Sequence, residues 1–158
     1  MGKCIVHFIP AKAGDCILLE LDYPHCILID CGFRSTYAQV LKPLLLHLNN
    51  LGYRVSLMII SHMDCDHIEG AISFLQENGL AENPKIIPVD NIWFNGFFNT
   101  LFNRPEFDAR RAKFLSEDIA EKMRNGLRDL KMQMSYEGQI SAKQCKSFEE
   151  LCAQGGYL

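Results

Sequence analysis

The hydrophobic positions in the first third of the chain fall into short continuous runs separated by turn residues. The runs are CIVHFIP at 4–10, CILLELD at 16–22 and CILIDCG at 26–32, with Gly14 and Pro24 in the stretches between them. Runs of this length, rich in Ile, Leu and Val and bounded by Gly or Pro, are typical of β-strands. Because the runs hardly alternate with polar residues, we expect strands that are buried on both faces, or nearly so.

The pattern then changes to helical spacing. Apolar residues recur every three to four positions within 35–52, which predicts an amphipathic helix that Pro43 is expected to split or kink. The run VSLMIIS at 55–61 predicts another buried strand, followed by a helix from 68 to 76 and an interrupted strand over 85–95. The order β-β-β-α-β-α-β predicts a mixed fold of the α/β or α+β class.

The last third of the chain is charged and rich in helix-forming residues. Apolar residues at helical spacing predict one long helix or two short ones within 105–135, and a final helix over 141–156. We therefore expect two parts, an α/β segment over 1–103 and a helical extension over 104–158, packed together as one compact unit.

The overall composition is that of an ordinary globular protein. The chain has 158 residues, of which 48% are hydrophobic and 22% charged, enough for one domain with a hydrophobic core. A formal net charge of −3 gives no bulk electrostatic case for binding nucleic acid or an anionic membrane. Seven cysteines without a C-x-x-C pair favour reduced thiols in a cytoplasmic protein. No run resembles a signal peptide or reaches transmembrane length, so we expect no membrane partner.

The stretch SHMDCDHIEGA at 61–71 brings together side chains that bind metals. His62, Asp64, Asp66 and His67 lie within six positions, where a buried strand is predicted to end and a helix to begin. Active sites of open α/β sheets collect at such strand ends, and imidazoles with carboxylates suit a divalent transition metal. The alternative is a polar loop in which Asp64 or Asp66 caps the helix. Because a cap requires only one short polar side chain, we predict a metal site.

This motif resembles that of the metallo-β-lactamase superfamily, which carries H-x-H-x-D-H between a strand and a helix. The form found here, H-x-D-x-D-H followed by I-E-G-A, is similar to a branch with Asp in place of the second His, which includes the hydrolase domains of ComEC-type DNA-uptake proteins. AGDCILLE at 13–20 and CILIDCG at 26–32 are similar to two further motifs of that branch. The three motifs lie in the family's order over residues 3–78. The resemblance implies half of an αββα sandwich.

The resemblance also implies a role for each residue of the motif. His62 and Asp64 would serve one metal site, and Asp66 and His67 would serve a second. A water activated by the metal would be the nucleophile, and Asp66 is the candidate catalytic residue that orients it. One or two divalent ions are implied, with manganese or iron as credible as zinc because a carboxylate replaces an imidazole.

Two further aspartates are expected near this site. Asp30 ends its strand and is expected to lie beneath the site as a hydrogen-bond partner of a ligand. Asp15 is either a second such partner or a turn-forming residue.

The chain lacks the ligands that the superfamily places further along its sequence. No histidine follows His67, and His7, His25 and His47 lie upstream, where we expect them to be ordinary surface or core residues. Only the first half of the sandwich is recognisable. Three explanations are open: the chain is a truncated form, a second copy or another chain completes the sandwich, or the half-domain is stable with different packing. We favour the first two.

Three functions are consistent with these observations. The first is a metal-dependent hydrolase, or its N-terminal part, that acts on phosphodiester or nucleic-acid substrates. The alternative is a catalytically incomplete half-domain that serves as an interaction module or is completed by a partner chain. A third hypothesis assigns nucleic-acid contact to the basic stretch RPEFDARRAKF at 104–114, although its neighbouring acidic residues favour a solvated amphipathic helix.

Overall fold

A five-stranded mixed sheet forms the centre of the protein. The structure is a computed structural model that describes residues 2, 4–94 and 136–157, with side chains from 143 onward in the last stretch. The strands are ordered β1-β2-β3-β4-β7 across the sheet. Their bounds are β1 (Ile5–Phe8), β2 (Ile17–Glu20), β3 (His25–Ile29), β4 (Arg54–Ile60) and β7 (Ile92–Phe94).

The direction of the strands follows from their connections. β1, β2 and β3 are joined by turns and pair antiparallel, whereas β3, β4 and β7 pair parallel and need helical crossovers. This arrangement confirms the predicted mixed α/β class and the predicted element order. The helices and the small hairpin are α1 (Arg34–Thr36), the π-helical turn η1 (Tyr37–Leu41), α2 (Lys42–Asn50), α3 (Cys65–Asn78), β5 (Gly79–Leu80), β6 (Asn83–Pro84) and α7 (Tyr136–Gly155).

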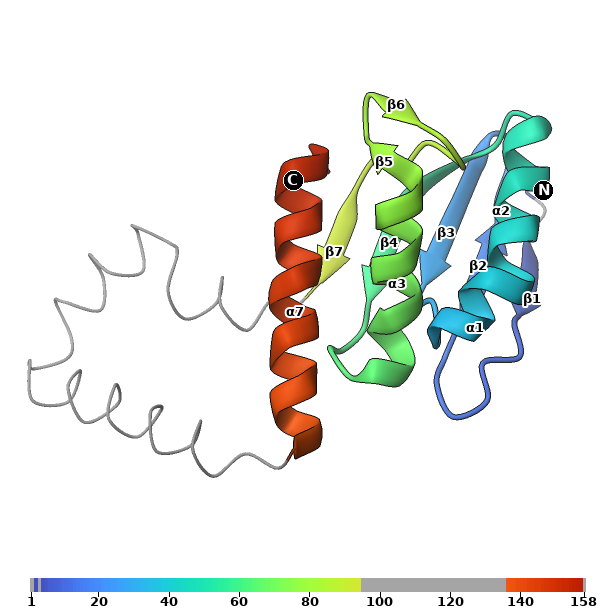
Figure 1. Ribbon diagram of the computed structural model, residues 1–158. Coiled ribbons are helices and arrows are strands. Elements are labelled where there is room, and N and C mark those ends of the chain that lie inside the picture. The colour runs from blue at the N-terminus through green and yellow to red at the C-terminus, as the bar shows by residue number, and fades with distance from the viewer. Residues whose placement is uncertain (1, 3, 95–135, 158) are drawn as a thin grey trace, which may run out of the picture.

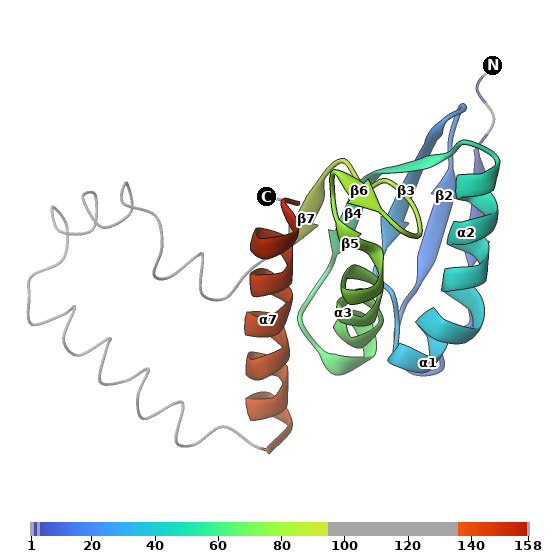
Figure 2. The ribbon, with the colours of Figure 1, turned by 45° about the horizontal axis from the view of Figure 1, so that its top comes forward.

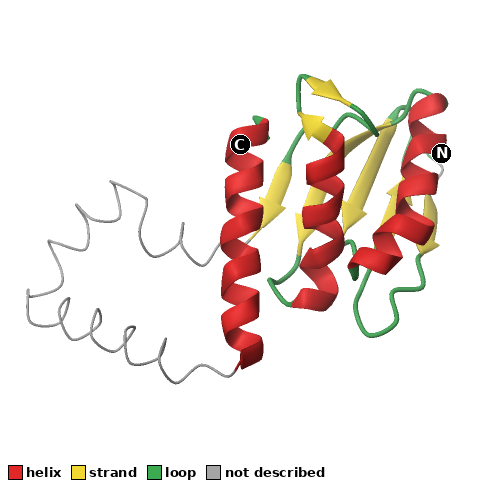
Figure 3. Cartoon of the chain, in the orientation of Figure 1, coloured by secondary structure: helices red, strands yellow, loops and turns green. Residues whose placement is uncertain are grey.

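The helices form a single layer on one face of the sheet. In Figure 1, α2, α3 and α7 stand side by side in front of the strands, and Figure 2 shows the same two layers from another angle. Figure 3 separates the helix layer from the strand layer by colour. Phe148, Cys152 and Tyr157, from α7 and the residue pair after it, belong to the same core as the sheet. The predicted extension thus shares the core of the α/β part, while its boundary at 103/104 and the helices predicted over 105–135 lie outside the described residues.

The core lies between this helix layer and the sheet. Leu18, Leu28 and Met58 are neighbours in register on β2, β3 and β4, so their side chains share one face, and all three are completely buried. Leu45 from α2 and Phe74 from α3 are buried in the same cluster. None of the helices in the described part of the chain combines the length and apolarity that a membrane span requires.

The opposite face of the sheet is apolar and lies open among the described residues. The prediction of strands buried on both faces is therefore wrong for this part of the chain, because no described element covers the second face (Figure 2). Phe8 is 78% exposed and Trp93 is 64% exposed on it. We call this surface the outer sheet face. The pairing registers place His25 and Arg54 at one end of it and assign to the rest Val6, Phe8, Ile17, Leu19, Ile27, Ile29, Leu57, Ile59 and Trp93.

Pro43 disturbs the regular α-helical pattern of the first helical segment, as predicted, but the segment continues beyond it. Proline lacks an N–H group, and its ring collides with the carbonyl four residues earlier in a regular α-helix. Here the five residues Tyr37–Leu41 form a π-helical turn immediately before Pro43, so the segment continues as α2 to Asn50. The wider π turn spaces the preceding carbonyls differently and accommodates the ring.

The strand predicted over 85–95 is much shorter in the structure. Only Ile92–Phe94 forms β7, and Val89 makes an isolated bridge to Val55. The backbone N–H groups of Ile86 and Ile87 donate to the side chain of Asn78 instead of to a neighbouring strand. A side chain from α3 thus takes the hydrogen bonds that a longer strand would have used.

Candidate metal centre

The candidate site lies at the carboxyl ends of the two central parallel strands. Asp30 directly follows β3 and Ser61 directly follows β4, so both residues reach the same edge of the sheet, at the bottom of Figure 1. The backbone N–H of Asp30 donates to the carbonyl of Ile59 at 2.9 Å, which continues the pairing of the strands up to the site. The N-terminus of α3 lies at the same edge. This is where ligands bind in open α/β sheets.

Two glycines let the backbones around the site touch directly. A Cβ atom on Gly14 would lie 1.7 Å from the carbonyl oxygen of Asp66, and one on Gly70 would lie 2.1 Å from that of Cys31. The backbone N–H of Gly70 donates to Gly32 at 2.8 Å. The β1–β2 loop and the segment after β3 are therefore packed against the first turns of α3 with no side chain between them.

Three of the four predicted metal ligands converge. His62, Asp66 and His67 each offer a ligand atom, and these atoms lie within 4.8 Å of one another. The imidazole rings of His62 and His67 have their centroids 3.7 Å apart at an interplanar angle of 48°. His67 is buried, Asp66 is half-buried and His62 is exposed to solvent. These three residues can hold a divalent cation with one side open to water.

Asp64 lies beside this group without belonging to it. Its side chain is 68% exposed, and its carboxylate is 3.8 Å from Nε2 of His62. Asp64 occupies the N-cap position of α3 in an extended conformation, yet its side chain makes no capping hydrogen bond. The predicted capping alternative is therefore not realised at Asp64. The helix begins at Cys65 and not at 68, so Asp66 and His67 project from its first turn.

Asp30 is buried at the centre of the site and contacts both Ser61 and His67. Its Oδ1 accepts a hydrogen bond from the backbone N–H of Ser61 at 2.8 Å. Its Oδ2 lies 2.6 Å from the hydroxyl of Ser61 and 3.0 Å from Nδ1 of His67. The side chain is 2% exposed, and the backbone adopts a left-handed φ of 53° that Asp tolerates better than most residues. Asp30 thus contacts His67 from the end of its strand, and its predicted role as the partner of a metal ligand stays a prediction.

Asp15 also reaches the centre. Asp15, Asp30 and His67 form a second group whose ligand atoms lie within 4.8 Å of one another. Gly14, next to Asp15, donates its N–H to Ala11 at 3.2 Å, so the segment is a turn as well. Asp15 thus lies close to His67 and directly after a turn, and which of the two predicted roles it has stays open.

The other histidines have partners away from this centre. His7 contacts Glu20 at 2.6 Å, and Nδ1 of His25 lies 2.7 Å from the hydroxyl of Ser56. His47 is exposed on α2. Among the described residues, none of the three joins a group of potential metal ligands, in agreement with the expectation that they are ordinary residues.

Sequence reasoning missed the part played by Ser61. Its hydroxyl lies between Oδ2 of Asp30 at 2.6 Å and Nδ1 of His62 at 2.9 Å. The only signal in the sequence is its position immediately before His62. The contact with Asp30 joins residues 31 positions apart, which no local pattern reveals.

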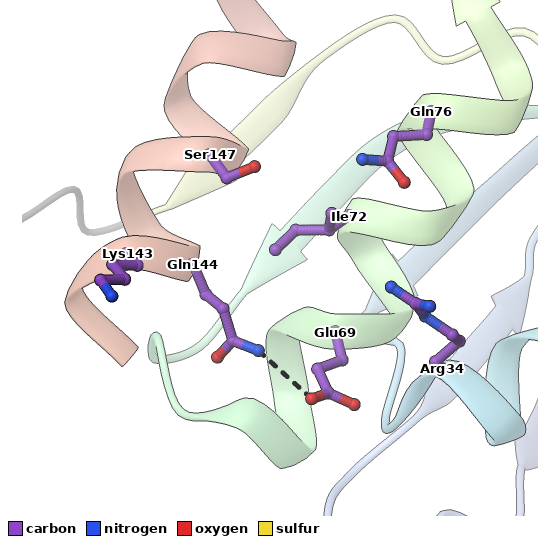
Figure 4. Close-up of a pocket in the computed structure, with 7 residues that line it drawn as sticks. All are labelled: Arg34, Glu69, Ile72, Gln76, Lys143, Gln144 and Ser147. Carbon is purple, nitrogen blue, oxygen red and sulfur yellow. Dashed lines mark hydrogen bonds between the residues drawn. The ribbon is translucent and has the colours of Figure 1, made fainter. Parts of the chain in front are cut away.

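A hollow lies within the helix layer, and none of the three converging ligand candidates lines it. It has a volume of about 310 Å³ and lies between α1, α3 and α7 (Figure 4). Gln144 of α7 donates to Glu69 at 3.2 Å and accepts from the thiol of Cys65 at 3.0 Å, so α7 contacts the first turns of α3. The residues that line the hollow are Arg34, Glu69, Ile72, Gln76, Lys143, Gln144 and Ser147.

No protein-family model matches this chain, and no curated protein matches it either. The resemblance to the metallo-β-lactamase superfamily therefore depends on the three sequence motifs and stays a prediction.

Proposed function

We propose that this chain is a metal-dependent hydrolase, or the N-terminal part of one, that acts on phosphodiester substrates. The observation that carries the proposal is the convergence of His62, Asp66 and His67 above the buried carboxylate of Asp30. A histidine that binds a metal almost always donates its other ring N–H to a carboxylate or carbonyl. His67 has this arrangement, with Nδ1 3.0 Å from Asp30.

The donor set suits a catalytic metal. Two imidazoles and one carboxylate provide three protein ligands and leave a coordination position for water or substrate. Asp64, 3.8 Å from Nε2 of His62 and largely exposed, can rotate toward the same cation, and Asp15 can contribute to a second one. These mixed nitrogen and oxygen ligands suit zinc, manganese or iron.

The reaction follows from these positions. A divalent cation supplies the acidity that lets water act as a nucleophile near neutral pH. Oδ2 of Asp66 lies 3.7 Å from Nε2 of His67, so Asp66 would hold a cation together with that histidine, and its second oxygen would be free to orient the attacking water. Asp30 keeps His67 in place through Nδ1. The preference for phosphodiesters, including nucleic acid, comes from the resemblance to the Asp-containing branch; the basic stretch at 104–114 lies outside the described residues.

Metal content and hydrolysis test this proposal together. Purified full-length chain, reconstituted separately with zinc and manganese, should retain at least one ion per chain and hydrolyse bis(p-nitrophenyl) phosphate and single-stranded DNA. His62→Asn should lose both properties, because it removes one of the three donors. His47→Asn is the matched control, since His47 is an exposed histidine away from the site. Absence of bound metal and of turnover in the wild-type chain would refute the proposal.

A second candidate function, an interaction module, is favoured by the outer sheet face. This face carries nine apolar side chains, and the registers place His25 and the charged Arg54 at one end of it. Contiguous exposed apolar patches mark interaction sites, and two sheets commonly pack face to face about 10 Å apart. We propose a second copy of this chain as the occupant. A copy presents the same apolar surface, and two-fold dimers are the commonest oligomers.

A matched pair of charge substitutions tests this dimer. Val6 on the outer sheet face is 45% exposed, and Val40 on the helix layer is 39% exposed, so the two valines differ mainly in the face they occupy. The wild-type chain should have twice the chain mass by light scattering, V6E should be monomeric, and V40E should remain dimeric.

Fluorescence of Trp93, the only tryptophan, reports on the same surface. Its emission should shift to longer wavelength in V6E as the indole becomes exposed to water. A monomeric wild-type chain would refute the dimer, and blue-shifted emission from that monomer would indicate that residues outside the described part cover the face.

A further inference from the structure

We infer that Ser61 is a positioning residue: with Asp30 it sets the tautomer of both histidines at the candidate metal centre. The inference deepens the proposed function and rests on it, because the tautomers matter only if the histidines bind a metal. The hydrogen bonds that define this role join atoms of the protein and require no bound metal. Ser61 and Asp30 form one relay that reaches His67 directly and His62 through the serine hydroxyl.

The first step is the direction of the bond between Ser61 and Asp30. A carboxylate only accepts hydrogen bonds, and a serine hydroxyl has a single proton to donate. Because Oγ of Ser61 lies 2.6 Å from Oδ2 of Asp30, that proton is directed to Asp30. The backbone N–H of Ser61 donates to Oδ1 at 2.8 Å and holds the carboxylate in this orientation.

The second step fixes the proton on His62. With its proton used, Oγ of Ser61 can only accept, and Nδ1 of His62 lies 2.9 Å away. Nδ1 of His62 must therefore carry the proton and donate it to Ser61. In the neutral imidazole the other nitrogen, Nε2, is then unprotonated and has a lone pair for a cation.

The third step is the direct branch to His67. Nδ1 of His67 lies 3.0 Å from Oδ2 of Asp30, which can only accept, so this nitrogen also carries its proton. Nε2 of His67 is unprotonated and lies 3.7 Å from the carboxylate of Asp66. The buried carboxylate of Asp30 therefore fixes both imidazoles in the form with Nε2 unprotonated. The Nε2 lone pairs are then available before any cation binds.

The structure also contains a matched serine–histidine pair outside the site. Nδ1 of His25 lies 2.7 Å from the hydroxyl of Ser56, and His25 is exposed. Ser56→Ala therefore removes the same kind of contact at a distance from the candidate metal centre. Ser61→Thr keeps the hydroxyl of the relay and serves as the conservative variant.

The test is the tautomer of each histidine in the metal-free full-length chain, measured by long-range proton–nitrogen correlation NMR at alkaline pH, where the imidazoles are neutral. Wild type should show protons on Nδ1 of both His62 and His67. Ser61→Ala should shift His62 toward the Nε2–H form while His67 stays unchanged, and Ser61→Thr should restore the wild-type spectrum. Ser56→Ala should leave both histidines as they are.

Metal affinity gives the second readout. Loss of a partner of a metal-binding histidine typically weakens binding by about 10- to 100-fold, so Ser61→Ala should lower zinc affinity by about that factor. Ser61→Thr and Ser56→Ala should bind zinc like the wild type.

The outcomes separate the inference from the proposed function. An Nε2–H form of His62 in the wild type, or an unchanged His62 in a folded Ser61→Ala, would overturn the inference even if metal binds. Should Ser61→Ala fail to fold, the wild-type tautomers decide alone. Nδ1–H on both histidines in a chain that binds no metal would support the relay and refute the proposed function.

Discussion

Replacing Gly14 with alanine should damage both the stability of the fold and the candidate metal centre. The added Cβ would lie 1.7 Å from the carbonyl oxygen of Asp66, and real Cβ atoms essentially never approach another heavy atom within 3.0 Å. The β1–β2 loop or the first turn of α3 must therefore move by about 1.3 Å. The obstructing atom belongs to the backbone, so no side-chain rotation relieves the contact.

The expected magnitude follows from this overlap. An overpacked contact typically lowers the free energy of unfolding by about 1–3 kcal/mol. Replacing glycine also makes the unfolded chain less flexible, which raises the free energy of unfolding by about 0.4–1 kcal/mol. The net cost is then up to about 2.6 kcal/mol, and for a chain of this length 1 kcal/mol corresponds to about 2–4 °C in melting temperature, so Gly14→Ala should melt up to roughly 10 °C lower. Metal–ligand distances vary by only about 0.2 Å, so a shift of this size at Asp66 should also weaken zinc binding, by about tenfold or more.

Thermal denaturation and zinc titration of the purified variant measure both effects. Gly2→Ala is the control, because its Cβ would meet only the carboxylate of Asp22, the end of a side chain that can rotate. If Gly14→Ala melts together with Gly2→Ala and binds zinc equally well, the direct packing of the loop on α3 is refuted.

Two further predictions concern buried polar and titratable groups. Asn78→Ala should cost about 2–4 kcal/mol in urea denaturation, because it leaves two buried backbone N–H groups without their acceptor; Gln76→Ala, at an exposed position on the same helix, should cost far less, and equal losses would contradict the assignment. Burial raises the pKa of the Cys16 and Cys152 thiols from 9.0 to about 12. The folded chain then keeps protons that the unfolded chain releases above pH 9. Stability is therefore unaffected by these thiols below pH 9 and falls as the pH rises further, by up to about 1.4 kcal/mol per pH unit for each thiol. Urea midpoints at pH 8 and pH 10 measure the fall, which should shrink in Cys16→Ala; identical midpoints would refute the effect.

Much of the architecture was predictable because it depends on local patterns. Short runs of Ile, Leu and Val predicted strands close to β1–β4, and apolar spacing predicted the helices between them. The start of α3 was placed too late, because the sequence around His62 and His67 reads as polar and the helix begins within it. Burial of the strands on both faces is not found among the described residues, since apolar composition does not reveal which faces other elements cover.

The candidate site, too, was predictable from the sequence only in part. Four metal-binding side chains within six consecutive positions can be recognised from the sequence alone, and so can the strand end that precedes them. Which of them converge was decided by the tertiary structure: Asp66 joins the two histidines, whereas Asp64 points largely into solvent.

The sequence by itself determined the elements, their order and the clustering of His62 to His67, because these properties depend on neighbours along the chain. Only the tertiary structure decided that Asp30 contacts Ser61 and His67, which lie 31 and 37 positions away. The parallel pairing of β3 with β4 brings their carboxyl ends to one edge of the sheet, and only that pairing places the buried carboxylate beneath the histidines.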